Sequence, residues 1–194
     1  MARQKVQDKE KAILDAAITV FAERGFWDTP TSLISKTAGI ADGTLFTYFK
    51  TKDDLINEVY LEIKREIADL LMKGINDYTT THGKMRHVWN YYIAWGVRNP
   101  IKFNVITQIG TSYPLSDEVK VQAMEPFAEI ERTAKASIAQ GEIQDYPVEY
   151  LAALMDSQSV LTVRFISALG SSDADLAKYQ QIGFDILWNG VVAR

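Results

Sequence analysis

The sequence predicts an all-α protein, and three features of the chain indicate this fold class. Apolar residues recur at spacings of three and four positions through every long segment, as they do between Ile13 and Ala22. No stretch shows the sustained alternation of apolar and polar residues that a half-buried strand requires. Glycine or proline separates the periodic segments, for example at Gly25, which is expected to end the first helix. We therefore expect about nine helices.

Capping residues and prolines predict where the later helices begin. Thr51 with Asp54 three residues later has the pattern of a capping box. Pro100 suits the first turn of a helix, where its missing N–H group costs nothing. Ser116 precedes two acidic residues, which favour the positive end of the helix dipole. Pro126 is expected to kink or divide the helix that follows Ser116, because proline interrupts the helical hydrogen bonds.

The composition excludes several classes of protein. The chain has 194 residues, a net charge of −4 and no cysteine. The absence of cysteine excludes a disulfide scaffold, a cysteine-ligated metal site and a thiol nucleophile. No run of 18 apolar residues exists to span a membrane, and the polar N-terminal segment does not resemble a secretory signal. A soluble cytoplasmic protein without a membrane partner is expected.

Two short, closely spaced helices are predicted before residue 50. Thr29 is expected to cap the first of them. Gly39 stands where a helix-turn-helix needs a positive φ, which glycine adopts without steric cost. Leu45 and Phe49 are four residues apart and are expected to face the core. Small residues at the start of the second helix would let its N-terminus approach a DNA groove closely.

Several short groups of residues follow one another without gaps between residues 9 and 56: Glu23-Arg24-Gly25-Phe26, Thr29, Ala38-Gly39-Ile40, Gly43-Thr44-Leu45-Phe46, Tyr48-Phe49 and Lys52-Asp53-Asp54-Leu55. Their order and spacing resemble the DNA-binding signature of the TetR/AcrR family of transcriptional repressors. The rest of the chain is similar to this family only in the number and length of its helices. The resemblance implies a helix-turn-helix domain over residues 1–52 and a ligand-binding and dimerisation domain over residues 53–194.

The resemblance also implies which residues contact DNA. Gly43 and Thr44 would meet base edges, and Lys52 would pair with the DNA backbone. The residues expected at the DNA are Thr29, Ser32, Asp42, Gly43, Thr44, Phe46, Thr47, Tyr48 and Lys52. Arg3 and Lys5 would extend this surface as a basic arm.

Two positions depart from the family pattern. Phe46 stands where the family usually has a tyrosine that contacts phosphate, so only an apolar or sugar contact remains. Ala41 cannot cap the recognition helix, and Asp42 follows it. The alternatives for Asp42 are a partial capping role, a hydrogen bond from the amino group of cytosine, or repulsion of a phosphate.

The negative net charge is unevenly distributed. Residues 1–52 carry a net charge of +2, and residues 53–194 carry −6. A mildly basic domain on an acidic body suits local contact with double-stranded DNA, whose strength should fall with salt.

Aromatic residues are dense between residues 85 and 113, which predicts either a packed core or an apolar ligand cavity. The candidate ligand-binding residues are Trp89, Tyr92, Trp95, Phe103, Gln108, Phe127 and Arg164. Arg164 lies in an apolar run and needs a partner if it is buried; alternatively it faces solvent or a subunit interface. His82 and His87 are poorly spaced for a metal, so no metal or cofactor is expected.

The last two predicted helices run from Pro147 to about Leu169 and from Asp173 to about Val192, and they are apolar on more than one face. One face would pack on the body, and the other needs a partner. The resemblance implies a homodimer that pairs these helices as a four-helix bundle. The residues expected at that interface are Leu154, Leu161, Phe165, Phe184, Leu187 and Trp188.

These observations predict a one-component transcriptional regulator that binds a palindromic operator as a dimer. We expect a repressor. A small molecule in the C-terminal body would release it from DNA, and the apolar composition weakly favours a lipophilic or aromatic effector. The sequence does not distinguish a repressor from an activator. The alternatives are an all-α ligand-binding or interaction module without sequence-specific DNA binding, and an enzyme, for which no catalytic constellation stands out.

Overall fold

A computed structural model describes residues 2–193, and side chains from residue 6 onward. These residues form ten α-helices and two short 3-10 helices. Within the described residues, one isolated antiparallel β-bridge pairs Ile143 with Val192. The α-helices are α1 (Ala2–Arg24), α2 (Thr31–Thr37), α3 (Asp42–Tyr48), α4 (Lys52–Met72), α5 (Thr81–Arg98), α6 (Pro100–Ser112), α7 (Asp117–Met124), α8 (Ala128–Ala139), α9 (Val148–Ala168) and α10 (Asp173–Val191), and the 3-10 helices are η1 (Ile75–Asp77) and η2 (Glu125–Phe127). The predicted all-α fold is confirmed. The side chains of Arg3 and Lys5 lie outside the described part of the chain.

The expected caps before α4 and α7 are present. The amide of Asp54 donates to the Thr51 hydroxyl at 3.0 Å, and the amide of Thr51 donates to the Asp54 carboxylate at 2.9 Å, which completes a capping box before α4. The amide of Val119 donates to the Ser116 hydroxyl at 3.3 Å before α7. These bonds satisfy backbone N–H groups that have no partner within the helix.

Pro126 divides the segment after Ser116. The chain leaves α7 at Met124, passes through η2 and continues as α8 from Ala128. This division accounts for a tenth helix where about nine are expected. None of the described helices is both long enough and apolar enough to span a membrane.

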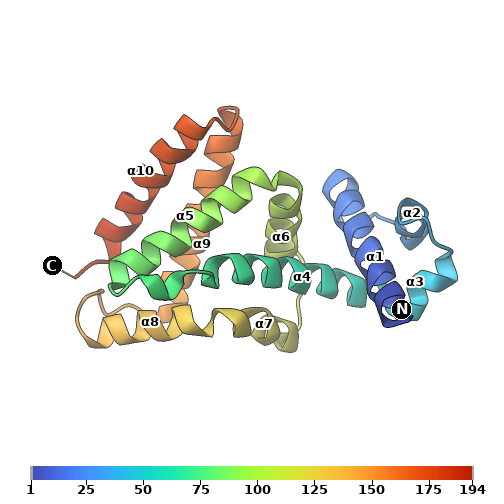
Figure 1. Ribbon diagram of the computed structural model, residues 1–194, viewed down its shortest axis with the longest axis horizontal. Coiled ribbons are helices and arrows are strands. Elements are labelled where there is room, and N and C mark those ends of the chain that lie inside the picture. Colours follow the sequence, from blue (N-terminus) through green and yellow to red (C-terminus); the bar gives the residue numbers. More distant parts are fainter. Residues whose placement is uncertain (1, 194) are drawn as a thin grey trace. The chain divides into compact units, whose positions relative to one another are not determined.

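The chain forms two compact units. The first contains residues 1–64 and 100–123, and the second contains residues 65–99 and 124–194. In the first unit α6 packs against α1, and α1 packs against α2 (Figure 1). The fully buried side chains of this unit come from α1, α2, α3, α4 and α6: Ile13, Ala17, Phe21, Ile34, Leu45, Leu55, Val59, Ile63 and Ile109.

The second unit is built on the mutual packing of α5, α9 and α10. Its centre is Trp89, which is fully buried and whose indole N–H donates to the carbonyl of Gln180 at 2.9 Å. A Cβ atom at Gly183 would lie only 2.6 Å from Cζ2 of Trp89 and 3.0 Å from the Thr162 hydroxyl. Glycine at residue 183 therefore allows α10 to approach α5 and α9 this closely.

Candidate nucleic-acid interface

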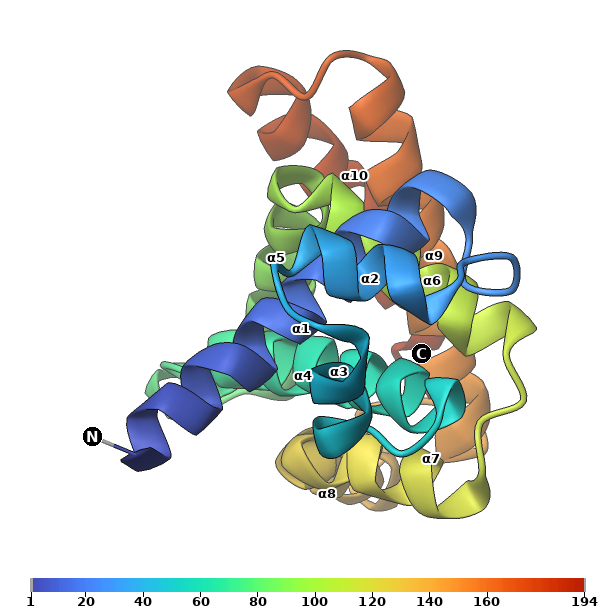
Figure 2. The same cartoon turned by 90° about the vertical axis from the view of Figure 1, so that its right-hand side faces the viewer.

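Helices α2 and α3 form a helix-turn-helix in the first unit (Figure 2). Gly39 lies in the turn with φ +68°, a left-handed conformation that favours glycine, as predicted. Ile34 from α2 and Leu45 from α3 are both fully buried, and they fix the two short helices on the unit. The opposite surface of α3 is therefore left to solvent.

The exposed surface of α3 has a central ridge and two flanks. Successive helical residues are about 100° apart, so residues 43 and 47 lie opposite the buried Leu45. Gly43 and Thr47 form this ridge, and both are exposed. The Thr47 hydroxyl donates to the Gly43 carbonyl at 3.0 Å. The ridge is consequently narrow and low, which lets another molecule approach the helix closely.

The two flanks of α3 differ in chemistry. Asp42 and Phe46 are four residues apart on one flank, and both are exposed, Phe46 to 43%. Thr44 and Tyr48 are four residues apart on the other flank and are half-buried. One flank thus presents a carboxylate and an apolar ring, whereas the other presents two hydroxyl groups.

Thr29 does not cap α2. The N-cap position is Pro30, which has no side chain able to cap, and α2 begins at Thr31. Thr29 is only 1% exposed, and its hydroxyl donates to the Gly25 carbonyl at 2.6 Å. This hydroxyl closes the loop after α1, so we leave Thr29 out of the DNA-binding surface proposed below. Ser32 is exposed on the first turn of α2.

Lys52 has an internal role that its sequence position did not predict. Its ammonium group donates to the carbonyl of Trp27 at 2.8 Å, and its side chain is half-buried. The bond ties the start of α4 to the loop between α1 and α2. Because the ammonium group keeps two further donors, the bond to Trp27 leaves capacity for a phosphate.

The neighbouring residue Asp53 holds the end of α6. Its carboxylate accepts a hydrogen bond from the Tyr113 hydroxyl at 2.5 Å. Burial raises the pKa of the Tyr113 phenol above its ordinary value, and the hydrogen bond to the Asp53 carboxylate raises that pKa further. The Tyr113 ring packs edge-on against Phe26 with centroids 5.5 Å apart. No local sequence pattern predicts this junction, because Asp53 and Tyr113 are 60 residues apart.

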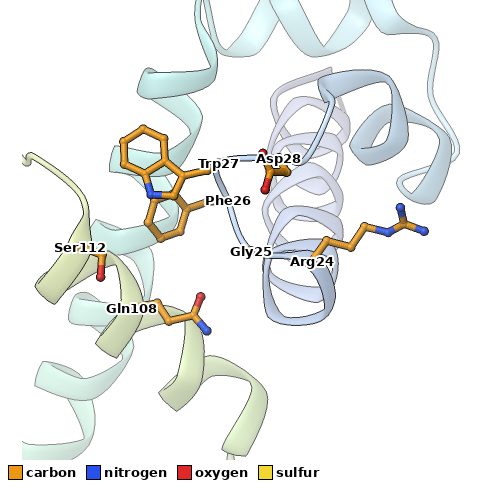
Figure 3. A pocket seen from close by; sticks show the side chains of 7 residues that line it. All are labelled: Arg24, Gly25, Phe26, Trp27, Asp28, Gln108 and Ser112. Carbon is orange, nitrogen blue, oxygen red and sulfur yellow. The ribbon is translucent and has the colours of Figure 1, made fainter.

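A pocket of about 280 Å³ lies beside this junction, between the α1–α2 loop and α6 (Figure 3). It is lined by Arg24, Gly25, Phe26, Trp27, Asp28, Gln108 and Ser112. Gln108, a predicted ligand-binding residue, therefore lies in the first unit near the helix-turn-helix, and its amide donates to Asn104 at 3.1 Å. It does not lie among the aromatic side chains of α5.

The other predicted ligand-binding residues separate into different environments. Trp89 and Trp95 are buried in the second unit, and the Trp95 indole N–H donates to the Glu66 carboxylate at 2.9 Å. Tyr92 stacks on Trp95 with ring centroids 6.1 Å apart. Phe103 is buried in the first unit. The aromatic stripe on α5 therefore contributes largely to the core of the second unit.

Phe127 and Arg164 complete that set. Phe127 is half-buried at the end of η2, and Arg164 is exposed on α9. An exposed guanidinium needs no buried partner, so the apolar run around Arg164 does not require an acidic ligand. His82, set aside as a metal ligand, packs edge-on against Phe184 and Trp188.

The predicted dimer residues also divide into two groups. Leu161 and Phe165 are 61% and 47% exposed on one face of α9, and Leu154 is half-buried. Phe184 and Leu187, also predicted at the dimer interface, are buried within the chain, so we leave them out of the interface proposed below. Their face of α10 turns inward to the packed helices α5 and α9.

The exposed apolar face of α10 carries residues that the sequence pattern did not single out. Ile182 and Ile186 are four residues apart and are 43% and 60% exposed. Trp188 is half-buried and stacks on Phe184. With apolar residues on more than one side of the helix, periodicity alone could not tell which side packs inward.

Residues 13–59 match the family described as bacterial regulatory proteins, tetR family. This stretch contains α2, the turn and α3 together with the ends of α1 and α4 that support them. This part of the chain is a helix-turn-helix domain of the TetR family. The resemblance of the helix-turn-helix to this family is thereby confirmed.

Two curated relatives support the assignment. The chain is 35% identical to the fatty acid metabolism regulator protein of Bacillus subtilis over 77 residues, which is 40% of each protein. It is 32% identical to the HTH-type transcriptional regulator AcrR of Shigella flexneri over 68 residues, which covers 35% of this chain and 32% of AcrR. The matched stretch therefore spans less than half of either relative.

Solved structures match nearly the whole chain. A TetR family transcription regulator from Marinobacter aquaeolei VT8 superimposes with a TM-score of 0.89 at 21% identity, over 99% of this chain and all of that one. The transcriptional regulator FadR from Bacillus subtilis, in complex with stearoyl-CoA, gives a TM-score of 0.74 at 23% identity, over 93% and 98% of the two chains. These likenesses show that the body of the chain also has the TetR fold.

Proposed function

We propose that this protein is a homodimeric transcriptional repressor that binds a palindromic operator. The observation that supports this best is the exposed surface of α3 on a helix-turn-helix that matches the TetR family. In this proposal residues 1–52 are the DNA-binding domain and residues 53–194 form the ligand-binding and dimerisation domain. The relatives are transcriptional regulators, and we propose regulation of transcription, in the cytoplasm, rather than catalysis.

The proposed DNA-binding surface uses the exposed or half-exposed members of the predicted set. They are Ser32, Asp42, Gly43, Thr44, Phe46, Thr47, Tyr48 and Lys52. A recognition helix with a narrow ridge can enter a major groove, which is about 12 Å wide. The hydroxyl groups of Thr44 and Tyr48 can donate to base edges or phosphates.

Dimerisation would supply the second recognition helix that a palindrome requires. The exposed apolar residues Leu161, Phe165, Ile182 and Ile186 on α9 and α10 are the proposed interface. Large apolar side chains exposed on adjacent helices favour association with a second copy. A two-fold dimer reads half-sites about one helical turn of DNA, or a multiple of it, apart.

A fatty acyl-CoA is the first effector to test. The relatives include a fatty acid metabolism regulator and FadR bound to stearoyl-CoA, and a lipophilic ligand agrees with the apolar composition of the body. Such a ligand would weaken operator binding by favouring a dimer whose two recognition helices no longer match both half-sites. Stearoyl-CoA added to an operator complex should release the protein, whereas coenzyme A alone should not.

Selection of bound duplexes from a random pool by the purified protein tests DNA binding. We expect enrichment of a palindrome, with affinity that falls as salt rises. Thr44→Ala should weaken binding to the enriched operator by about 1–3 kcal/mol if the hydroxyl contacts a base. Equal weakening on every duplex would identify a phosphate contact instead. No preference over random duplex would contradict the proposed function and favour a ligand-binding module without DNA specificity.

A further inference from the structure

The Asp42–Phe46 flank of α3 is chemically unsuited to the DNA backbone. Within the described part of the chain, the Asp42 carboxylate makes no hydrogen bond or ion pair, and Phe46 is 43% exposed beside it. A carboxylate repels a phosphate, and a phenyl ring has no donor for one. The Thr44–Tyr48 flank, by contrast, carries two hydroxyl donors.

We infer that the Asp42–Phe46 flank reads pyrimidines in the major groove, with Phe46 packed against the C5-methyl group of a thymine and Asp42 accepting a hydrogen bond from the N4 amino group of a cytosine. This inference rests on the proposed function and specifies how its recognition helix discriminates bases. Among the groups in the major groove, the thymine methyl is the apolar one and matches Phe46. The donors are the amino groups of cytosine and adenine, but adenine also presents its N7 acceptor, which a carboxylate would repel, so cytosine matches Asp42 better.

The spacing of the two side chains fits a pair of nearby bases. Four helical residues advance the chain by about 6 Å. Successive bases along one strand are about 3.4 Å apart, so this advance corresponds to about two base steps. The low ridge of Gly43 and Thr47 allows the flank to approach base edges. Pyrimidines contacted by Asp42 and Phe46 should consequently lie within one half-site.

Uracil substitution tests the Phe46 contact directly, because uracil differs from thymine only by the missing methyl group. The operator obtained by selection with the full-length protein is synthesised with uracil at each thymine in turn, in both half-sites, and affinity is measured at one fixed salt concentration. Loss of one buried methyl group should weaken binding about fourfold per half-site. The expected result is one symmetric position at which uracil in both half-sites weakens binding by the wild-type protein about 15-fold.

Phe46→Ala should bind the thymine and uracil operators equally. Because Phe46 is exposed, this variant is expected to fold normally. Val121→Ala is the matched control: Val121 is 64% exposed on α7, outside the proposed DNA-binding surface, and the variant should keep the full penalty for uracil. If Phe46→Ala keeps that penalty, or if no thymine responds in the wild-type protein, the Phe46 inference is overturned while sequence-specific binding stands.

The Asp42 contact is tested with a second variant. The wild-type protein should bind about tenfold more weakly when the contacted C·G base pair is changed to G·C. Asp42→Ala should bind the two operators equally. Tighter binding of Asp42→Ala to all duplexes alike would mean that Asp42 faces a phosphate, and would overturn this contact. If the protein enriches no duplex sequence in the selection, both this inference and the proposed function on which it rests are contradicted.

Discussion

Two helical glycines, Gly43 on α3 and Gly183 on α10, show how differently the two units use the same residue. A Cβ atom at Gly183 would collide with Trp89, so the packing of the second unit explains this glycine completely. A Cβ atom at Gly43 would meet no atom within 4 Å. Glycine in a helix lowers stability by about 0.5–1 kcal/mol relative to alanine. No close packing contact at Gly43 requires glycine there. Packing within the chain thus accounts for Gly183 but not for Gly43, which agrees with the proposal that α3 approaches DNA closely.

The largest expected effect comes from disrupting the proposed dimer interface on α9, which belongs to the second unit, and measuring operator binding by α3, which belongs to the first. Leu161→Asp combined with Phe165→Asp places charges on the exposed face of α9 without disturbing the buried core. We expect a folded monomer by analytical ultracentrifugation and an operator affinity lower by about 10²–10⁴-fold, because the second half-site is no longer bound by a tethered partner. Val121→Asp, on an exposed residue of α7, should remain dimeric. A doubly substituted protein that stays dimeric would contradict the proposed interface.

Gly183→Ala should strongly affect folding. The added methyl group would overlap the Trp89 ring, which cannot move easily because its indole N–H is bonded to Gln180. We expect a loss of about 1–3 kcal/mol in the free energy of unfolding, measured by urea denaturation.

Gly190→Ala is the matched control for Gly183→Ala on the same helix. A Cβ atom there meets nothing within 4 Å, so the variant should be unchanged or slightly more stable. Equal stabilities of the two variants would show that α10 does not approach α5 as closely as described.

Tyr113→Phe removes the hydrogen bond between the end of α6 and Asp53. We expect a loss of about 0.5–1.5 kcal/mol in the free energy of unfolding at neutral pH, measured by urea denaturation. The phenol has a raised pKa in the folded protein, so its neutral form is the one that folding stabilises. The contribution is therefore complete below the unfolded pKa of about 10 and is lost as pH rises through the folded value.

The pH dependence distinguishes this bond from simple packing. The wild-type advantage over Tyr113→Phe should shrink in strongly alkaline solution. An advantage that stays constant there would assign the effect to the packing of the ring against Phe26 instead.

Gly43→Ala has the smallest expected effect on stability, with the opposite sign. The protein should gain about 0.5–1 kcal/mol in the free energy of unfolding, because alanine is the better helix former and has room. Binding to the selected operator should nevertheless weaken, since the methyl group holds the helix away from base edges. A variant that is more stable and binds equally well would show that the ridge of α3 does not approach DNA closely.

The local patterns in the sequence were sufficient for the helices and the helix-turn-helix. The capping box of Thr51 and Asp54, the turn at Gly39 and the division at Pro126 each depend on residues a few positions apart. Such short-range chemistry acts in the same way in any fold, and it can be recognised without knowing the tertiary structure.

The tertiary structure decided which side of each helix faces inward and which distant residues meet. Phe184 and Leu187 had the same apolar character as Ile182 and Ile186, and only the packing of α10 against α5 and α9 separated buried from exposed residues. The bonds of Lys52 to Trp27 and of Asp53 to Tyr113 join residues 25 and 60 positions apart. Periodicity records that a face is apolar, but the identity of its neighbour depends on contacts between elements distant in the chain.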